Sequence, residues 1–173
     1  MSGRPPRDVA FVGCSTVGAV QARAVRRAVS VGGRRVKTVD VHAHCGVPAA
    51  MDLMGLKLPT EALLMSAEGR LRARLLAMDE QGIDVEALSI NPYWYKAERD
   101  LAREIIRLQN EAMAEACASN PERFVAFASV ALQHPDLAAE QLEEGMKKHG
   151  LRGAAIGGSV DGAELSDPRF HPF

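Results

Sequence analysis

The sequence lacks the features of several classes of protein. None of its apolar stretches reaches the roughly 18 uncharged residues that a membrane-spanning helix needs, so we expect no membrane as a partner. The 173 residues carry 21 Lys and Arg against 22 Asp and Glu, a balance that gives no electrostatic reason to expect nucleic acid. The three cysteines have no CxxC spacing, which argues against a disulfide framework and fits a reducing compartment. What is left, with 47% apolar residues, is the composition of an ordinary soluble globular protein.

Charge is divided unevenly along the chain. Residues 1–40 contain eight Arg or Lys and two acidic residues, a net charge of +6, whereas the remainder carries −7. This basic segment includes a weakly apolar run at residues 9–20 and loosely imitates a targeting peptide, although small and polar residues interrupt the run. We therefore expect a cytoplasmic protein, with export or an organelle as the alternative. We divide the chain into a basic extension, residues 1–37, and one domain, residues 38–173.

The end of the extension carries a hairpin signal. Between β-branched residues in the segment 29–37 stands the sequence Val-Gly-Gly-Arg, in which the two glycines suit a two-residue turn. We expect a small β-hairpin that leads into the first strand of the domain.

From residue 38 onward, short β-branched runs alternate with longer segments of helical spacing. The expected strands span residues 38–43, 85–90, 124–132 and 152–156. One expected helix begins after Ser66 and stops at Gly82, a second spans residues 97–119, and a third begins at Pro135 and ends at Gly150. Four βα units predict an α/β fold with a parallel sheet covered by helices. The periodicity alone fits both a small open sheet and part of a barrel.

One motif is chemically sharp. His42 and His44 stand at the carboxyl end of the first expected strand, and side chains at positions i and i+2 of a strand point to the same face. Two imidazoles side by side suit a divalent metal, and zinc accepts imidazole nitrogen well. The competing interpretation is two histidines packed at a strand end, and spacing alone does not decide between them.

The motif D-x-H-x-H on a first strand resembles the amidohydrolase superfamily of metal-dependent (β/α)8 barrels. Further segments resemble the branch that contains aminocarboxymuconate-semialdehyde decarboxylase and related aromatic-acid decarboxylases; they are residues 78–89, 120–127, 151–158 and 165–173. The resemblance runs from about Val39 to the last residue. It covers only the first half of the family domain, so the fold that it implies is the N-terminal half of a TIM barrel behind a basic extension.

This resemblance implies one divalent metal ion, with zinc as the expected metal and His42 and His44 as its first two ligands. The fourth expected strand contains no lysine that could bridge two metals, which favours the one-metal branch. The remaining ligands and the catalytic residues of the family lie on later strands, so we expect them beyond residue 173.

Other residues near the expected strand ends are weaker candidates. Asn91, Tyr93 and Trp94 follow the second strand on the expected active face, where they could contact a planar acid or simply cover the barrel end or an oligomer contact. Asp40 shares a face with His42 and could orient an imidazole, although a role in the strand mouth is an equal alternative.

The function implied is that of a metal-dependent decarboxylase acting on a small unsaturated or aromatic carboxylic acid, in the full-length protein. One alternative is a metal-dependent hydrolase of a lactone, ester or amide. Another is a half barrel without activity that acts only by association, because open strand edges and exposed apolar faces are poorly tolerated. We expect a homo-oligomer, and we expect the 173 residues alone to show no turnover.

Overall fold

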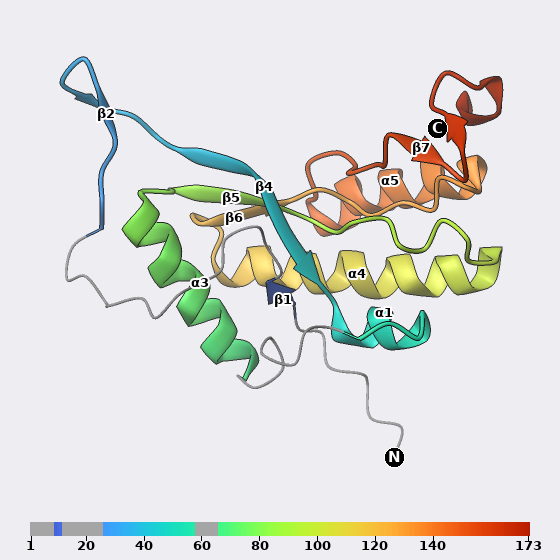
Figure 1. Ribbon diagram of the computed structural model, residues 1–173, viewed down its shortest axis with the longest axis horizontal. Helices are drawn as coiled ribbons and strands as arrows, with labels where there is room; N and C mark the ends of the chain where they lie inside the picture. The colour runs from blue at the N-terminus through green and yellow to red at the C-terminus, as the bar shows by residue number, and fades with distance from the viewer. Residues whose placement is uncertain (1–8, 12–25, 58–65) are drawn as a thin grey trace.

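The computed structural model describes residues 9–11, 26–57 and 66–173, and its architecture is α/β (Figure 1). The central sheet contains, in spatial order, β1 (Ala10–Phe11), β4 (Val39–Gly46), β5 (Val85–Ser89) and β6 (Phe124–Ala126). Strands β4, β5 and β6 are parallel, and β1 runs antiparallel to β4. A parallel sheet with helical crossovers is what the alternating sequence pattern predicts.

The helices follow the strands in the expected alternation. The three expected helices are α3 (Ala67–Gln81), α4 (Arg99–Ser119) and α5 (Pro135–His149), and a short helix that the sequence pattern did not predict, α1 (Pro48–Leu53), follows β4. Figure 1 shows α3 and α4 on the same side of β5 and β6, so these helices cover one face of the sheet. The main hydrophobic core includes the fully buried side chains of Trp94, Phe124 and Leu88.

Local signals fix both ends of α3. Ser66 caps the first turn, because its Oγ accepts a hydrogen bond from the backbone N–H of Gly69 at 3.1 Å. Gly82 ends the helix at a φ of 79°, a left-handed conformation that glycine adopts without steric cost. Both ends of this helix are confirmed as expected from the sequence.

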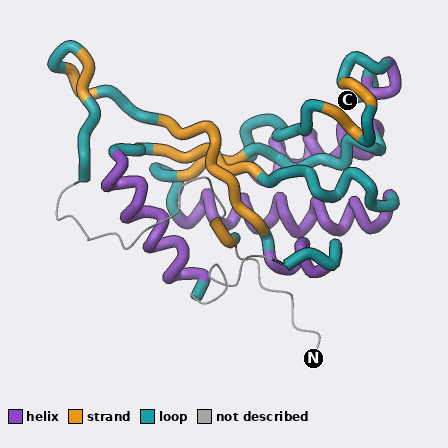
Figure 2. Tube along the Cα trace, viewed as in Figure 1, coloured by secondary structure: helices purple, strands orange, loops and turns teal. Residues whose placement is uncertain are grey.

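The hairpin in the extension is confirmed as well. Strands β2 (Ser30–Val31) and β3 (Arg34–Arg35) pair antiparallel around Gly32 and Gly33. Both glycines have positive φ angles, 56° and 75°. A type I′ turn needs positive φ at both central residues, and its twist matches the right-handed twist of the two strands that it joins. Figure 2 shows this hairpin projecting from one end of the molecule.

The fourth expected strand is only partly formed. Residues 152–156 contribute a single parallel bridge, Ala128 to Ala154, in place of a continuous ladder. Backbone hydrogen bonds still align the segment beside the continuation of β6, including Ala128 N–H to the Gly153 carbonyl at 2.7 Å. Gly153 has a φ of 103°, outside the extended region, and this interrupts the strand.

The chain after this bridge contains regular structure that the sequence pattern did not reveal. A second small hairpin consists of β7 (Ser159–Val160) and β8 (Ala163–Glu164), and a 3₁₀ turn, η1, spans Pro168–Phe170. Val160 and Phe170 are buried against the main core.

The edge of the first barrel strand is covered in part, which corrects the expectation of a fully open edge. Ala10 pairs with Gly46, and Phe11 pairs with Cys45, so β1 closes the carboxyl end of β4. The Phe11 ring stacks on Phe124 at 5.8 Å. The segment therefore packs on the domain, and the division of the chain at residue 37 stays a prediction.

A charged cluster ties the hairpin to the amino end of β5. The Asp84 carboxylate accepts hydrogen bonds from Arg26 at 2.6 Å, from Arg35, and from the backbone N–H of Thr38 at 2.7 Å. These donors lower the pKa of Asp84 to about 2, with the Arg35 bond as the largest cause and the Thr38 bond next. A buried carboxylate thus anchors two separate segments of the extension.

We expect Asp84→Asn to lower the free energy of unfolding by about 1.5–3 kcal/mol at neutral pH, because charged hydrogen bonds are lost. The folded pKa lies below the unfolded one, so Asp84 contributes stability above about pH 4 and loses it as the pH falls toward 2. When urea unfolding is measured across this pH range, the free energy of unfolding should fall more steeply with decreasing pH in the wild type than in the variant. Asp52→Asn, at the exposed surface of α1, is the matched control. If the free energy of unfolding fell equally with decreasing pH in the wild type and in Asp84→Asn, the prediction would be wrong.

Candidate active site

The candidate site lies at the carboxyl ends of the parallel strands. Because β4 and β5 are parallel, their carboxyl ends meet at one edge, where barrel enzymes build their active sites. His42 and His44 come from β4, and Ser89 is the last residue of β5. The loop that begins with Asn91 follows directly.

The two histidines lie together as their spacing predicts. Their ring centroids are 4.6 Å apart, and the rings meet edge to face at 85°. His42 is exposed and His44 is half-buried. The Ser89 hydroxyl lies 3.2 Å from Nδ1 of His44, and Nε2 of the same ring takes no part in this hydrogen bond.

An irregularity in β4 sets the position of this contact. Asp40 pairs with Glu86, but Ala43 pairs with Leu88, so β4 contains one more residue than β5 over this stretch. This is the two-against-one pattern of a β-bulge, a feature common beside active sites. The bulge brings His44 into register with Ser89.

Asp40 stabilises the backbone at the bulge. Its Oδ1 accepts a hydrogen bond from the backbone N–H of His42 at 2.9 Å. Among the described residues, its carboxylate forms no hydrogen bond to an imidazole, so the expected contact with a histidine ring is absent here. Asp40 is the second residue of β4 and lies opposite Glu86, near the amino end of the strand, so its proposed role at the strand mouth stays a prediction.

The aromatic loop divides into an exposed part and a buried part. Tyr93 is 57% exposed, and its hydroxyl lies 3.3 Å from the Asn91 side-chain nitrogen. Trp94 is only 1% exposed, and its indole N–H donates to the Val130 carbonyl at 2.9 Å. Trp94 therefore packs in the core, which corrects the expectation that it offers a surface to substrate; for Asn91 and Tyr93 that role stays a prediction.

Tyr95 holds the loop against the last part of the chain. Its hydroxyl accepts a hydrogen bond from the backbone N–H of Gly157 at 3.0 Å, and its ring meets Trp94 edge to face. Burial raises the pKa of Tyr95. A side chain at Gly157 would crowd this ring, since a Cβ there would lie 3.1 Å from Cε2.

The outer face of the same strands holds a buried ion pair. Arg74 donates to Glu86 at 2.8 Å, and both side chains are almost fully buried. Desolvation raises the pKa of Glu86, and the Arg74 bond opposes that shift. Burial also raises the pKa of the Cys45 thiol to about 12.

The donor set fits a divalent metal as two of its ligands. Two adjacent imidazoles on one face are a common contribution of a single strand. Within residues 9–11, 26–57 and 66–173, no cluster of three or more His, Cys, Asp or Glu side chains could hold an ion. A complete site therefore needs donors beyond those that the structure describes.

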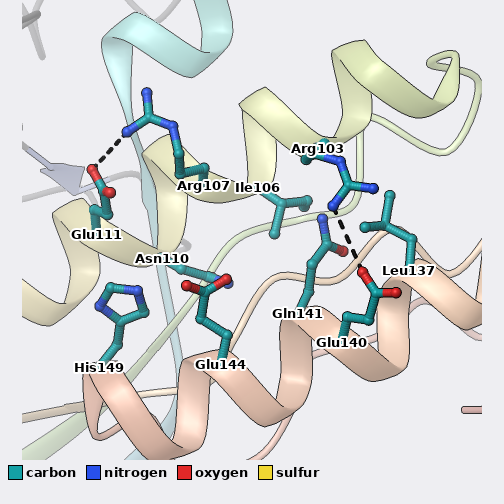
Figure 3. Close-up of a pocket in the computed structure, with 10 residues that line it drawn as sticks. All are labelled: Arg103, Ile106, Arg107, Asn110, Glu111, Leu137, Glu140, Gln141, Glu144 and His149. Carbon is teal, nitrogen blue, oxygen red and sulfur yellow. Dashed lines mark hydrogen bonds and ion pairs between the residues drawn. The ribbon is translucent and has the colours of Figure 1, made fainter.

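A separate groove of about 250 Å³ lies between α4 and α5 (Figure 3). All of its lining residues belong to these two helices, and Arg103 forms an ion pair with Glu140 across it at 3.6 Å. His149 stands at its end, in a last helical turn that also carries two lysines, as the helix dipole favours. The groove lies in the helix layer and contains neither histidine of β4.

The fold and the histidine pair define half of an α/β barrel with two potential metal donors at its carboxyl mouth. A family model described as amidohydrolase matches residues 39–173, and the chain belongs to this family. In the described part of the chain, no helix is both long and apolar enough to cross a lipid bilayer.

Curated relatives of the chain are decarboxylases. It is 40% identical over 111 residues to γ-resorcylate decarboxylase of Rhodococcus jostii (strain RHA1), a match that covers 58% of this chain and 34% of that one. It is 28% identical over 104 residues to 2-amino-3-carboxymuconate-6-semialdehyde decarboxylase of Dictyostelium discoideum, a match that covers 58% of this chain and 28% of that one. The chain spans about a third of the length of the curated relatives it matches.

Solved structures agree on the fold. The 2,6-dihydroxybenzoate decarboxylase from Rhizobium superimposes with a TM-score of 0.59 at 29% identity, over 78% of this chain and 44% of that one. A dihydroxybenzoic acid decarboxylase from Polaromonas sp. JS666, solved with bound manganese and the inhibitor 2-nitroresorcinol, superimposes with a TM-score of 0.53 at 32% identity. This match covers 68% of this chain and 37% of that one. The half-barrel prediction is thus confirmed. Manganese in the Polaromonas structure gives no support to zinc as the expected metal.

Sequence reasoning missed one residue of this site, Ser89. Its position at the end of a buried strand was visible in the sequence, but its register opposite His44 depends on the bulge.

Proposed function

We propose that this chain supplies the first strands of the active site of a metal-dependent decarboxylase that acts on a small aromatic carboxylic acid. The observation that carries the proposal is the pair of imidazoles 4.6 Å apart at the carboxyl mouth of the half barrel. The names of the curated relatives, which are decarboxylases over their whole lengths, support the reaction class. Because the chain spans about a third of those enzymes, the activity belongs to the whole protein.

His42 and His44 would hold a divalent metal together with donors from other parts of the protein. Such a metal, when bound, supplies a Lewis acid for an anionic substrate. Manganese is the first metal to test, since it is bound in solved relatives. His42 is exposed and His44 is half-buried, so the pair is open to the mouth of the barrel.

Tyr93 and Asn91 would flank the substrate. Tyr93 presents a largely exposed aromatic ring immediately after β5, and an aromatic surface suits a planar acid. The Asn91 amide next to its hydroxyl adds a polar group that can select a substituent of the ring. Decarboxylation breaks the bond between the ring carbon and the carboxyl carbon, releases CO₂ and delivers a proton to the ring carbon. The donor of that proton is to be sought outside the described residues.

The test is CO₂ release by the protein expressed from the whole reading frame that includes these 173 residues. With Mn²⁺ and 2,6-dihydroxybenzoate, we expect stoichiometric CO₂ and resorcinol formation that a chelator abolishes and that His42→Ala reduces to background. His149→Ala, in the helical groove, should retain activity. Lactone, ester or amide hydrolysis without CO₂ release from any aromatic acid would overturn the proposal in favour of a hydrolase.

Three further expectations accompany this proposal. We propose that the protein is cytoplasmic, that it assembles as a homo-oligomer, and that the isolated 173 residues show no turnover. The last follows from the donor set, because two imidazoles hold a metal weakly compared with three or four ligands.

A further inference from the structure

Within the described structure, the hydroxyl of Ser89 on β5 lies within hydrogen-bond distance of a ring of the histidine pair. Ser89 is only 8% exposed, and its Oγ lies 3.2 Å from Nδ1 of His44. We propose that Ser89 is a positioning residue, which fixes the ring orientation and the tautomer of His44 so that Nε2 faces the metal. This inference rests on the proposed metal site and adds to it a residue outside the ligand set.

The register of the sheet makes this contact specific. If β4 and β5 continued from the Asp40–Glu86 pair without interruption, Ala43 would lie opposite Ser89 and His44 opposite Ile90. The bulge shifts β4 by one residue and pairs His44 with Ser89. A hydroxyl thereby replaces an aliphatic side chain as the neighbour of the imidazole.

The hydrogen bond at Nδ1 determines which nitrogen of the His44 ring can bind a metal. A neutral ring carries one N–H and one lone pair, and a metal binds the nitrogen with the lone pair. When Nδ1–H donates to the Ser89 oxygen, the lone pair resides on Nε2. Histidines that bind metals commonly donate the N–H of their second ring nitrogen to a carboxylate, a backbone carbonyl or a water, which fixes both the tautomer and the ring plane, and we propose that the Ser89 oxygen takes this acceptor role.

His42 depends on the same arrangement indirectly. Within the described part of the chain, no hydrogen bond reaches the His42 ring, and its recorded ring contact is with His44. The backbone of His42 is held by Asp40. Ser89 therefore orients the ring of His44, and the ring of His44 in turn limits the ring of His42.

The first test measures the tautomer without any metal. Long-range ¹H–¹⁵N spectra of the histidine-labelled protein, with His44→Gln to assign the signals, report which nitrogen of the neutral ring carries the proton. We expect the Nδ1–H form in the wild type and in Ser89→Thr, which keeps the hydroxyl. Ser89→Ala should show a mixture in which Nε2–H predominates, as in free imidazole side chains. A wild-type ring in the Nε2–H form would overturn the role of Ser89.

The second test measures Mn²⁺ affinity of the full-reading-frame protein by electron paramagnetic resonance of the free ion. We expect Ser89→Ala to weaken binding roughly 10- to 100-fold and Ser89→Thr to restore it. The matched control is Ser129→Ala, because Ser129 is also buried, with 1% exposed against 8% for Ser89, and its hydroxyl has no hydrogen-bond partner among the described residues. Equal affinity of Ser89→Ala and wild type would overturn the inference.

The two proposals fail in different ways. A wild-type protein that binds no Mn²⁺ overturns the metal site itself, whatever the tautomer of His44. A protein that binds Mn²⁺ normally after Ser89→Ala leaves the metal site intact and overturns only the positioning role.

Discussion

His44→Ala should weaken Mn²⁺ binding by more than roughly 100-fold, because loss of a ligand should exceed the 10- to 100-fold effect of losing a residue that orients one. His42→Ala should have a similar effect, since the two rings lie side by side with their centroids 4.6 Å apart. The measurement is a titration of the full-reading-frame protein with Mn²⁺, followed by the resonance signal of the free ion.

Two histidines outside the site serve as controls for this result. His149 ends α5 and lines the groove between helices, and His171 follows the 3₁₀ turn near the end of the chain. Alanine at either position should leave the Mn²⁺ affinity unchanged. A loss of affinity at His149 equal to that at His44 would mean that the ion binds the helix surface, and the account of the site would be wrong.

Trp94→Ala should lower the free energy of unfolding by about 3–5 kcal/mol, the usual range for a large aromatic side chain in a core. The side chain is 1% exposed, and the substitution also removes the hydrogen bond to Val130 and leaves that carbonyl without the indole. Urea unfolding monitored by circular dichroism is the suitable measurement, because the variant loses the single tryptophan as a fluorescent probe.

The neighbouring residue provides a matched comparison. Tyr93 is 57% exposed, so Tyr93→Ala should change the free energy of unfolding by no more than about 0.5 kcal/mol. If Tyr93 contacts the substrate as proposed, the same variant should raise KM for 2,6-dihydroxybenzoate. Equal destabilisation by the two substitutions would contradict the division of the loop into a buried and an exposed half.

Local chemistry made much of the fold predictable. The turn at Gly32 and Gly33, the cap at Ser66 and the helix end at Gly82 each depend on residues close in sequence, and all three form as expected. The alternation of apolar runs with helical segments likewise predicted the parallel strands β4, β5 and β6, although β6 ends at Ala126 and does not continue to residue 132 as expected. In each case the signal and the structure that it specifies lie within a few residues of each other.

Long-range pairing was beyond what the sequence could reveal. Strand β1 contains only Ala10 and Phe11, and its place on β4 depends on packing of the Phe11 ring against Phe124. The bulge in β4 has no signal of its own, yet it decides that Ser89 meets His44. Both features arise from contacts between segments that are distant in the chain.

The direction of a loop side chain was equally hidden. Trp94 follows a strand on the active face, and composition alone could not distinguish a ring facing the substrate from one facing the core. The structure turns Trp94 inward, where its N–H reaches a carbonyl, and leaves Tyr93 outward. The histidine pair was predictable because alternation along one strand fixes the relative direction of its side chains.

The most direct test of the account is anomalous diffraction from crystals of the full-reading-frame protein grown with Mn²⁺. We predict one anomalous peak at the carboxyl end of β4, within bonding distance of Nε2 of both His42 and His44, with Ser89 still hydrogen-bonded to Nδ1 of His44. A manganese ion bound elsewhere, with His42 and His44 packed against each other and free of metal, would contradict the central claim.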